Sequence, residues 1–151
     1  MPEKETLERA RRDKREGKAP STQAGEFVRE EMDHIREGKH GARSPQQAIA
    51  IGLSKARRAG VDLPPSESSS EETKEQAERD IHKARSGGKK SAKRARATSK
   101  ALKREGRSAA SKEALSSQAR SAARKRSAAS RSRSAKKAAA TRKKTAAARK
   151  K

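Results

Sequence analysis

Residues 44–60 read SPQQAIAIGLSKARRAG, and this stretch carries the clearest fold signal in the chain. Ser44, Pro45 and Gln47 stand where a helix N-cap, its first helical residue and the closing glutamine of a capping box are expected. Apolar residues then recur at helical spacing, and Gly60 supplies the left-handed residue with which helices commonly end. The stretch therefore predicts one helix with an apolar face.

The segment before it, residues 21–38, predicts a second helix. Ser21 or Thr22 is the expected N-cap, and Gly38 is the expected C′ residue. Residues spaced three and four apart share one face of a helix. The apolar residues with this spacing are Ala24, Phe27, Val28, Met32 and Ile35.

These two helices predict a hairpin domain over residues 21–65. The later helix has small residues at Ala48, Gly52 and Ala56, a spacing that allows a partner helix to approach closely. A unit of this size is only slightly larger than domains that need a metal, a disulfide or a partner for stability. We expect homodimerisation through the hairpin, or contact with a charged and fraying helix in residues 1–20, to complete it.

The net charge of +23 is concentrated near the C-terminus. Residues 1–66 sum to +3 and residues 67–88 to −2, whereas residues 89–151 hold 24 Lys and Arg against two Glu, or +22. We therefore divide the rest of the chain into an acidic, Ser- and Glu-rich linker over 66–88 and a low-complexity tail over 89–151. Within the linker, Glu71 to Arg85 is compatible with a helix.

The overall composition predicts a mostly α protein with a long basic tail. Hydrophobic residues make up 28% of the 151 residues and charged residues 40%. Chains of low hydrophobicity and high net charge bury too little apolar area to offset their conformational entropy. We expect a small helical hairpin joined to an intrinsically disordered or conditionally helical tail that folds on binding.

Several classes of protein are disfavoured by what the chain lacks. It has no Cys, which excludes disulfides and thiolate metal sites. Its longest apolar run, at residues 48–51, is far shorter than a membrane span, and the charged residues 1–18 do not resemble a secretory signal. We expect a cytoplasmic, nucleoid-located protein that is not an enzyme and needs no cofactor.

The basic tail predicts a polyanion as the partner. Lys and Arg neutralise phosphates and release condensed counterions, which gives affinity without sequence choice. Readers of RNA and single strands usually stack bases on aromatic side chains, and the tail has none. We expect a histone-like protein that binds duplex DNA. The predicted contact residues are Lys89, Lys90, Lys93, Arg94, Arg96, Lys100, Lys103, Arg104, Arg107, Arg120, Arg124, Lys125, Arg126, Arg131, Arg133, Lys136, Lys137, Arg142, Lys143, Lys144, Arg149, Lys150 and Lys151.

Two alternatives stay open at this point. The first concerns function: instead of binding duplex DNA, the protein is an RNA- or ribosome-associated basic protein whose hairpin is a protein-interaction module. The turn over residues 38–44 is either a plain glycine turn or a second phosphate site beside the N-terminus of the following helix. The residues that would serve such a site are Lys39, His40, Arg43, Arg57 and Arg58.

Two further groups are interpreted as solvated rather than functional. The histidines His34, His40 and His82 lack the spacing of known metal motifs, and no HExxH sequence is present. An acidic row in the first helix of the hairpin resembles paired catalytic carboxylates, but without a pocket it is expected to face solvent. Its members are Glu26, Glu30, Asp33 and Glu37.

Residues 21–64 also resemble a family of small, uncharacterised bacterial basic proteins. The resemblance rests on the stretches EGKHG at 37–41, SPQQAIAIGLS at 44–54 and ARRAG at 56–60. Some members are labelled DNA-binding or plasmid-stabilisation proteins. The tail resembles the Lys- and Ala-rich ends of histone H1-like bacterial nucleoproteins, which implies DNA compaction, although it lacks the prolines of eukaryotic linker-histone tails.

Overall fold

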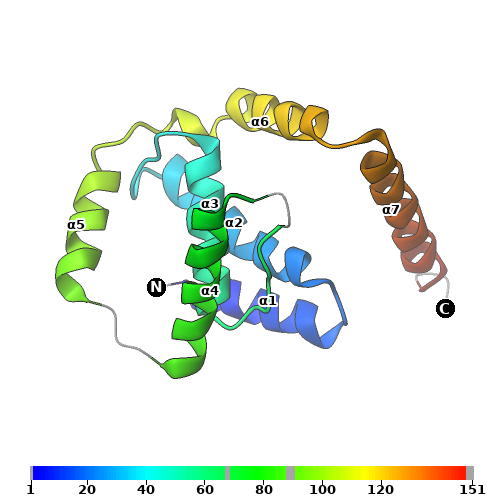
Figure 1. Cartoon of the computed structure of the whole chain (residues 1–151), viewed down its shortest axis with the longest axis horizontal. Coiled ribbons are helices and arrows are strands. Elements are labelled where there is room, and N and C mark those ends of the chain that lie inside the picture. The colour runs from blue at the N-terminus through cyan, green and yellow to red at the C-terminus, as the bar shows by residue number, and fades with distance from the viewer. Residues whose placement is uncertain (1, 67–68, 88–90, 149–151) are drawn as a thin grey trace. The chain divides into compact units, whose positions relative to one another are not determined.

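The computed structural model describes the backbone of residues 2–66, 69–87 and 91–148, with side chains as far as residue 143, and these residues contain helices and no strand (Figure 1). The described helices are α1 (Lys4–Arg15), α2 (Pro20–Arg36), α3 (Pro45–Arg58), α4 (Glu71–Ser86), α5 (Ala92–Leu102), the 3₁₀ helix η1 (Ser108–Ala110), α6 (Lys112–Lys125) and α7 (Ala128–Ala148).

The prediction of a long disordered or conditionally helical tail is wrong. Helices α5, η1, α6 and α7 occupy most of residues 91–148. Ala, Lys and Arg are strong helix formers, and this part of the chain has no proline to interrupt them. Serine side chains also accept hydrogen bonds from backbone N–H groups where the helices start. They are Ser91 (from Arg94, 3.5 Å), Ser111 (from Ala114, 3.1 Å) and Ser127 (from Ser130, 3.2 Å).

The chain forms two compact units, Met1–Ala114 and Leu115–Lys151. The first unit contains α1 to α5, η1 and the beginning of α6, and the second contains the rest of α6 and α7.

Helix α2 is the centre of the first unit, where it packs against α1, α3 and η1, while α4 packs on α3 (Figure 1). Phe27, 1% exposed, lies in a core cluster with Ala10 of α1 and Ala56 of α3. Leu7 of α1 packs on the same cluster. The hairpin is therefore completed by α1, as one of the two expectations proposed. Fraying of α1 and dimerisation through the hairpin both stay predictions.

Helix α3 approaches α2 most closely at Gly52. A Cβ atom placed on Gly52 would lie 2.7 Å from the Cα and 2.9 Å from the Cγ2 of Val28. Only glycine lets the two backbones come this close without a shift of one helix. The small-residue face predicted for α3 therefore marks its contact with α2, and Ala48 and Ala56 on that face are fully buried.

Most of the predicted helix ends are confirmed. Ser44 caps α3, and its hydroxyl accepts a hydrogen bond from the backbone of Gln47 at 3.2 Å. Gly38 and Gly60 have φ angles of 78° and 90°. The start of α2 was predicted wrongly. Its N-cap residue is Ala19, because Pro20 takes the first helical position and leaves Ser21 and Thr22 inside the helix.

Helix α4 is fastened to α3 by a buried carboxylate. Asp80, which has no exposed surface, accepts hydrogen bonds from Ser54 at 2.5 Å, Arg58 at 2.8 Å and Gln76 at 3.2 Å. Ala77, 1% exposed, occupies the adjacent turn of α4. The helix predicted for Glu71 to Arg85 is confirmed.

We predict that Gly52→Ala destabilises the protein by about 1–3 kcal/mol, because its methyl group would meet the backbone of Val28. Gly25→Ala is the matched control, since Gly25 also lies within a helix but has open space around it. This control should stabilise the protein by up to about 1 kcal/mol through helix propensity. Urea unfolding followed by far-UV circular dichroism measures both. A stabilising effect of Gly52→Ala would contradict the close approach.

Candidate nucleic-acid interface

The C-terminal helices carry cations that have no carboxylate partner. Every Lys and Arg from 93 to 143 has an exposed side chain. Within this described stretch, none of them forms an ion pair with Glu105 or Glu113, and Glu105 instead lies 3.7 Å from Arg43. The positive charge on α5, α6 and α7 is therefore uncompensated at the surface.

The first four helices differ, because acidic side chains there pair with many of the cations. Arg9 bridges α1 to Glu26 of α2 at 2.6 Å, and Arg58 bridges α3 to Asp80 of α4 at 2.8 Å. The other Lys and Arg residues within the described ranges 2–66 and 69–87 that lie within 4.0 Å of a carboxylate are Arg12, Lys18, Arg36, Lys39, Arg43, Lys55, Lys74 and Arg79. We refer to α1, α2, α3 and α4 together as the bundle. The positive charge is thus compensated by ion pairs in the bundle and not in α5 to α7.

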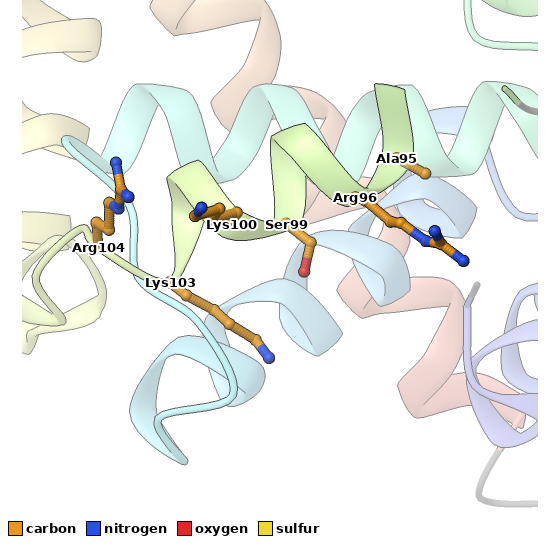
Figure 2. A pocket seen from close by; sticks show the side chains of 6 residues that line it. All are labelled: Ala95, Arg96, Ser99, Lys100, Lys103 and Arg104. Atoms are coloured by element: carbon orange, nitrogen blue, oxygen red, sulfur yellow. The ribbon is translucent and has the colours of Figure 1, made fainter. Parts of the chain in front are cut away.

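Helix α5 shows the uncompensated charge in its simplest form. Figure 2 shows a shallow pocket along this helix, with Ala95 and Ser99 among the cationic side chains. Four cations line it, two within the helix and two in the turn that follows Leu102. They are Arg96, Lys100, Lys103 and Arg104. No acidic residue lies in α5.

The C-terminal end of α5 is held by the loop between α2 and α3. The backbone N–H of Gly41 donates to the carbonyl of Leu102 at 2.9 Å, and that of Ala42 donates to Gly106 at 3.0 Å. A Cβ atom on Gly41 would lie 2.0 Å from the carbonyl oxygen of Glu105. Just beyond, Ala110 is buried, and its carbonyl accepts a hydrogen bond from Arg36 of α2 at 3.1 Å. These contacts anchor the basic helix to the bundle.

In the second unit, α7 presents positive charge on all sides. Successive residues of a helix are 100° apart, so Arg131, Arg133 and Lys136 point in three different directions around the axis. Arg126, just before the helix, donates to the hydroxyl groups of Ser130 and Ser134. A helix of this kind can contact phosphates whichever side faces a polyanion.

The five residues proposed for a second phosphate site have partners within the fold. Lys39 lies 3.1 Å from Glu3 and 3.0 Å from Glu37, which raise the pKa of its ammonium group. Arg57 donates to the carbonyl of Leu63 at 2.9 Å, and burial lowers its pKa.

Two other members of that group are similarly engaged, since His40 lies 3.2 Å from Glu31 and Arg58 binds Asp80. Arg43 lies 3.7 Å from Glu105, but its side chain is 79% exposed. The backbone N–H groups of Gly41 and Ala42 in the same turn already donate to carbonyl groups. Phosphate binding at this turn stays a prediction.

Part of the predicted tail contact set lies outside the described residues. These residues are Lys89, Lys90, Arg149, Lys150 and Lys151, and the side chain of Lys144 belongs with them.

The interpretation of the histidines as solvated is confirmed only for His82, which is exposed. The side chains of His34 and His40 are 13% and 15% exposed. The carboxylates beside these two rings, Glu30 and Glu31, are themselves buried, with 4% and 1% of their surface exposed. The expectation that the acidic row faces solvent is therefore wrong for Glu30.

One local signal could have revealed this cluster. Glu31 and His34 are three residues apart in α2, so they share a face of the helix. The approach of His40 depends on how the chain returns after Gly38, which local spacing does not specify.

Residues 19–67 are similar to a family of unknown function (DUF6496). The match spans α2, α3 and their flanking turns, which is less than half of the chain, and it leaves α5, α6 and α7 outside. It confirms the predicted resemblance to an uncharacterised family. No curated protein and no solved structure matches the chain. Within the described residues, no helix is long and apolar enough to cross a membrane.

We predict that Gly41→Ala releases α5 from the bundle, because its methyl group cannot share space with the carbonyl of Glu105. The amides of residues 41 and 42 should then exchange with solvent faster, which amide hydrogen exchange measures. Gly106→Ala is the control on the opposite segment, where a Cβ atom meets nothing within 4 Å. Equal protection in both variants would show that the anchoring contact does not form.

Proposed function

We propose that this protein is a non-enzymatic DNA-binding protein that neutralises the phosphate backbone with little sequence preference. The observation that carries the proposal is the exposed and uncompensated cations of α5, α6 and α7. Displacement of condensed counterions by such cations supplies most of the affinity in nonspecific DNA binding. The proposal implies a nucleoid-associated, cytoplasmic protein.

Duplex DNA fits these helices better than single strands do. Phe27 is the one aromatic residue of the chain, and it is 1% exposed in the core of the bundle. The surface therefore has no aromatic platform on which an unpaired base could stack. Cationic helices fit the major groove of duplex DNA, which is wide enough to admit an α-helix.

Weak sequence preference follows from the types of side chain that accompany the cations. Asn and Gln read adenine through paired hydrogen bonds, and residues 91–148 contain no Asn and a single Gln, at 118. Ala and Ser, the other common residues of these helices, make few distinctive contacts with base edges. The Lys- and Ala-rich composition also resembles histone H1-like nucleoproteins, which supports backbone binding.

The bundle serves as the scaffold in this proposal. Its α2–α3 loop anchors the C-terminal end of α5 through Leu102 and Gly106. Because acidic residues of the bundle pair with its own cations, it contributes little net charge, and the C-terminal helices contribute most of the attraction. Contact between DNA and the bundle itself is expected to be minor.

We predict that neutralising the cations that line the pocket along α5 weakens binding to duplex DNA. The variant replaces Arg96 and Lys100 of the helix, and Lys103 and Arg104 of the following turn, with Gln, which keeps helix propensity at the two helical positions. If all four contact phosphates, the slope of log K against log salt should become shallower by about 3 to 4. Fluorescence anisotropy with a labelled duplex at several salt concentrations measures this slope.

The matched control removes the same charge from α1. Replacing the exposed Lys4, Arg11, Lys14 and Arg15 with Gln gives an identical net charge, but α1 also carries acidic residues. Its salt slope should change by less than about 1. Equal losses in the two variants would mean that total charge, and not the C-terminal helices, determines binding. Tighter binding to a structured RNA at the same salt concentration would favour an RNA-associated role.

A further inference from the structure

Glu31, His34 and His40 bring three metal-binding side chains to one point of the bundle. Glu31 and His34 share a face of α2, and His40 comes from the loop that follows. Their ligand atoms all lie within 4.8 Å of one another. The Nε2 atom of His40 is 3.2 Å from the Oε1 atom of Glu31. For metal–ligand bonds of about 2.0–2.1 Å, two ligands of a tetrahedral zinc ion are separated by about 3.3 Å.

The hydrogen bond of His40 leaves its Nε2 atom facing the carboxylate. The Nδ1 atom lies 3.1 Å from the carbonyl oxygen of Gly41, so Nδ1 carries the proton and donates it to that carbonyl. In a neutral imidazole the Nε2 atom then has only a lone pair, and it faces another acceptor, Glu31 Oε1. Either a second ring proton or a metal ion between the two atoms resolves this contact. A backbone carbonyl bonded to the other nitrogen is the usual support of a metal-binding histidine.

Three carboxylate oxygens at this point form no hydrogen bond of standard geometry, whereas Glu30 Oε2 accepts one from the backbone N–H of Glu3 at 3.1 Å. Glu30 Oε1 and both carboxylate oxygens of Glu31 are buried without a hydrogen bond that satisfies the usual geometry. The ammonium group of Lys55 lies 2.5 Å from Glu31 Oε2 and 3.7 Å from Glu30 Oε1. One ammonium thus faces two buried carboxylates, and buried carboxylates need a paired charge or a metal.

We propose that Glu31, His34 and His40 form a binding site for a divalent transition metal, with Zn²⁺ as the best fit. Two imidazoles and a carboxylate are ligands that zinc accepts in tetrahedral sites, whereas Mg²⁺ and Ca²⁺ prefer oxygen ligands throughout. Glu3 Oε1 lies 2.9 Å from His34 Nε2 and 3.1 Å from Lys39 Nζ, but Glu3 is not among the side chains whose ligand atoms lie within 4.8 Å of one another, so a water molecule is the expected fourth ligand. Zinc at His34 Nε2 would replace the proton that this atom donates to Glu3.

Such a site would join α2 to the loop that follows it. His34 lies in the last turns of α2, and His40 is adjacent to Gly41, whose backbone anchors Leu102. A bound ion would therefore stabilise the loop that anchors α5. The site shares no side chain with the proposed DNA contacts on α5, α6 and α7, although His40 also belongs to the group predicted for the second phosphate site.

The unmodified protein, without an affinity tag, gives the first test. Long-range ¹H–¹⁵N spectra of the histidine rings are recorded while Zn²⁺ is added, and Co²⁺ is added separately as a visible probe of coordination geometry. The proposal predicts one equivalent bound, with shifts at His34 and His40 and none at the exposed His82. It also predicts the strong visible absorption that is typical of tetrahedral Co²⁺.

Single substitutions give the second test. His34→Gln and His40→Gln should each weaken Zn²⁺ binding at least tenfold in competition with a chromophoric chelator. His82→Gln is the matched control and should leave the affinity unchanged. Absence of Zn²⁺-induced shifts at His34 and His40 in the unmodified protein would overturn the proposal, whatever the variants do. Binding that persists in both histidine variants would overturn it as well.

Discussion

The distribution of acidic side chains is the constraint on which both halves of this molecule depend. Seventeen of the 19 Asp and Glu residues lie before residue 89, and many of them pair with cations of the bundle. Arg9 with Glu26 joins α1 to α2, and Arg58 with Asp80 joins α3 to α4. Pairing of this kind fastens four helices around a small core, in which alanines outnumber the larger side chains Phe27, Met32, Ile35 and Val61. Residues 89–151 contain only two Glu residues, and the helices of this segment keep a positive surface.

The helices that could be predicted from the sequence are those with local signals. Ser44, Pro45 and Gly60 specify the ends of α3 through capping chemistry, which depends only on near neighbours. The composition of the tail predicts disorder, and this prediction is wrong because the local helix propensity of its residues favours helices. Ala-rich helices with serine caps do not need a large core to be continuous, and α5 buries no residue.

The parts of the site that sequence analysis missed depend on contacts between distant segments. The exposed cations could be predicted, since a Lys- and Arg-rich segment has few ways to bury them. The anchoring of Leu102 by Gly41 links residues that lie 61 positions apart, and no local pattern specifies it. Similarly, Lys39 and Arg58 are cations that the fold uses for ion pairs, which charge counting cannot distinguish from free ones.

Chemical footprinting of lysines on the full chain, with and without duplex DNA, tests the division between scaffold and binding helices most directly. Acylation of each lysine is quantified by mass spectrometry at one salt concentration. DNA is expected to lower the reactivity of lysines on the C-terminal helices, among them Lys100, Lys125 and Lys137. The equally exposed Lys4, Lys14 and Lys83 of the bundle should keep their reactivity. Protection concentrated on these three bundle lysines, or spread evenly over both groups, would contradict it.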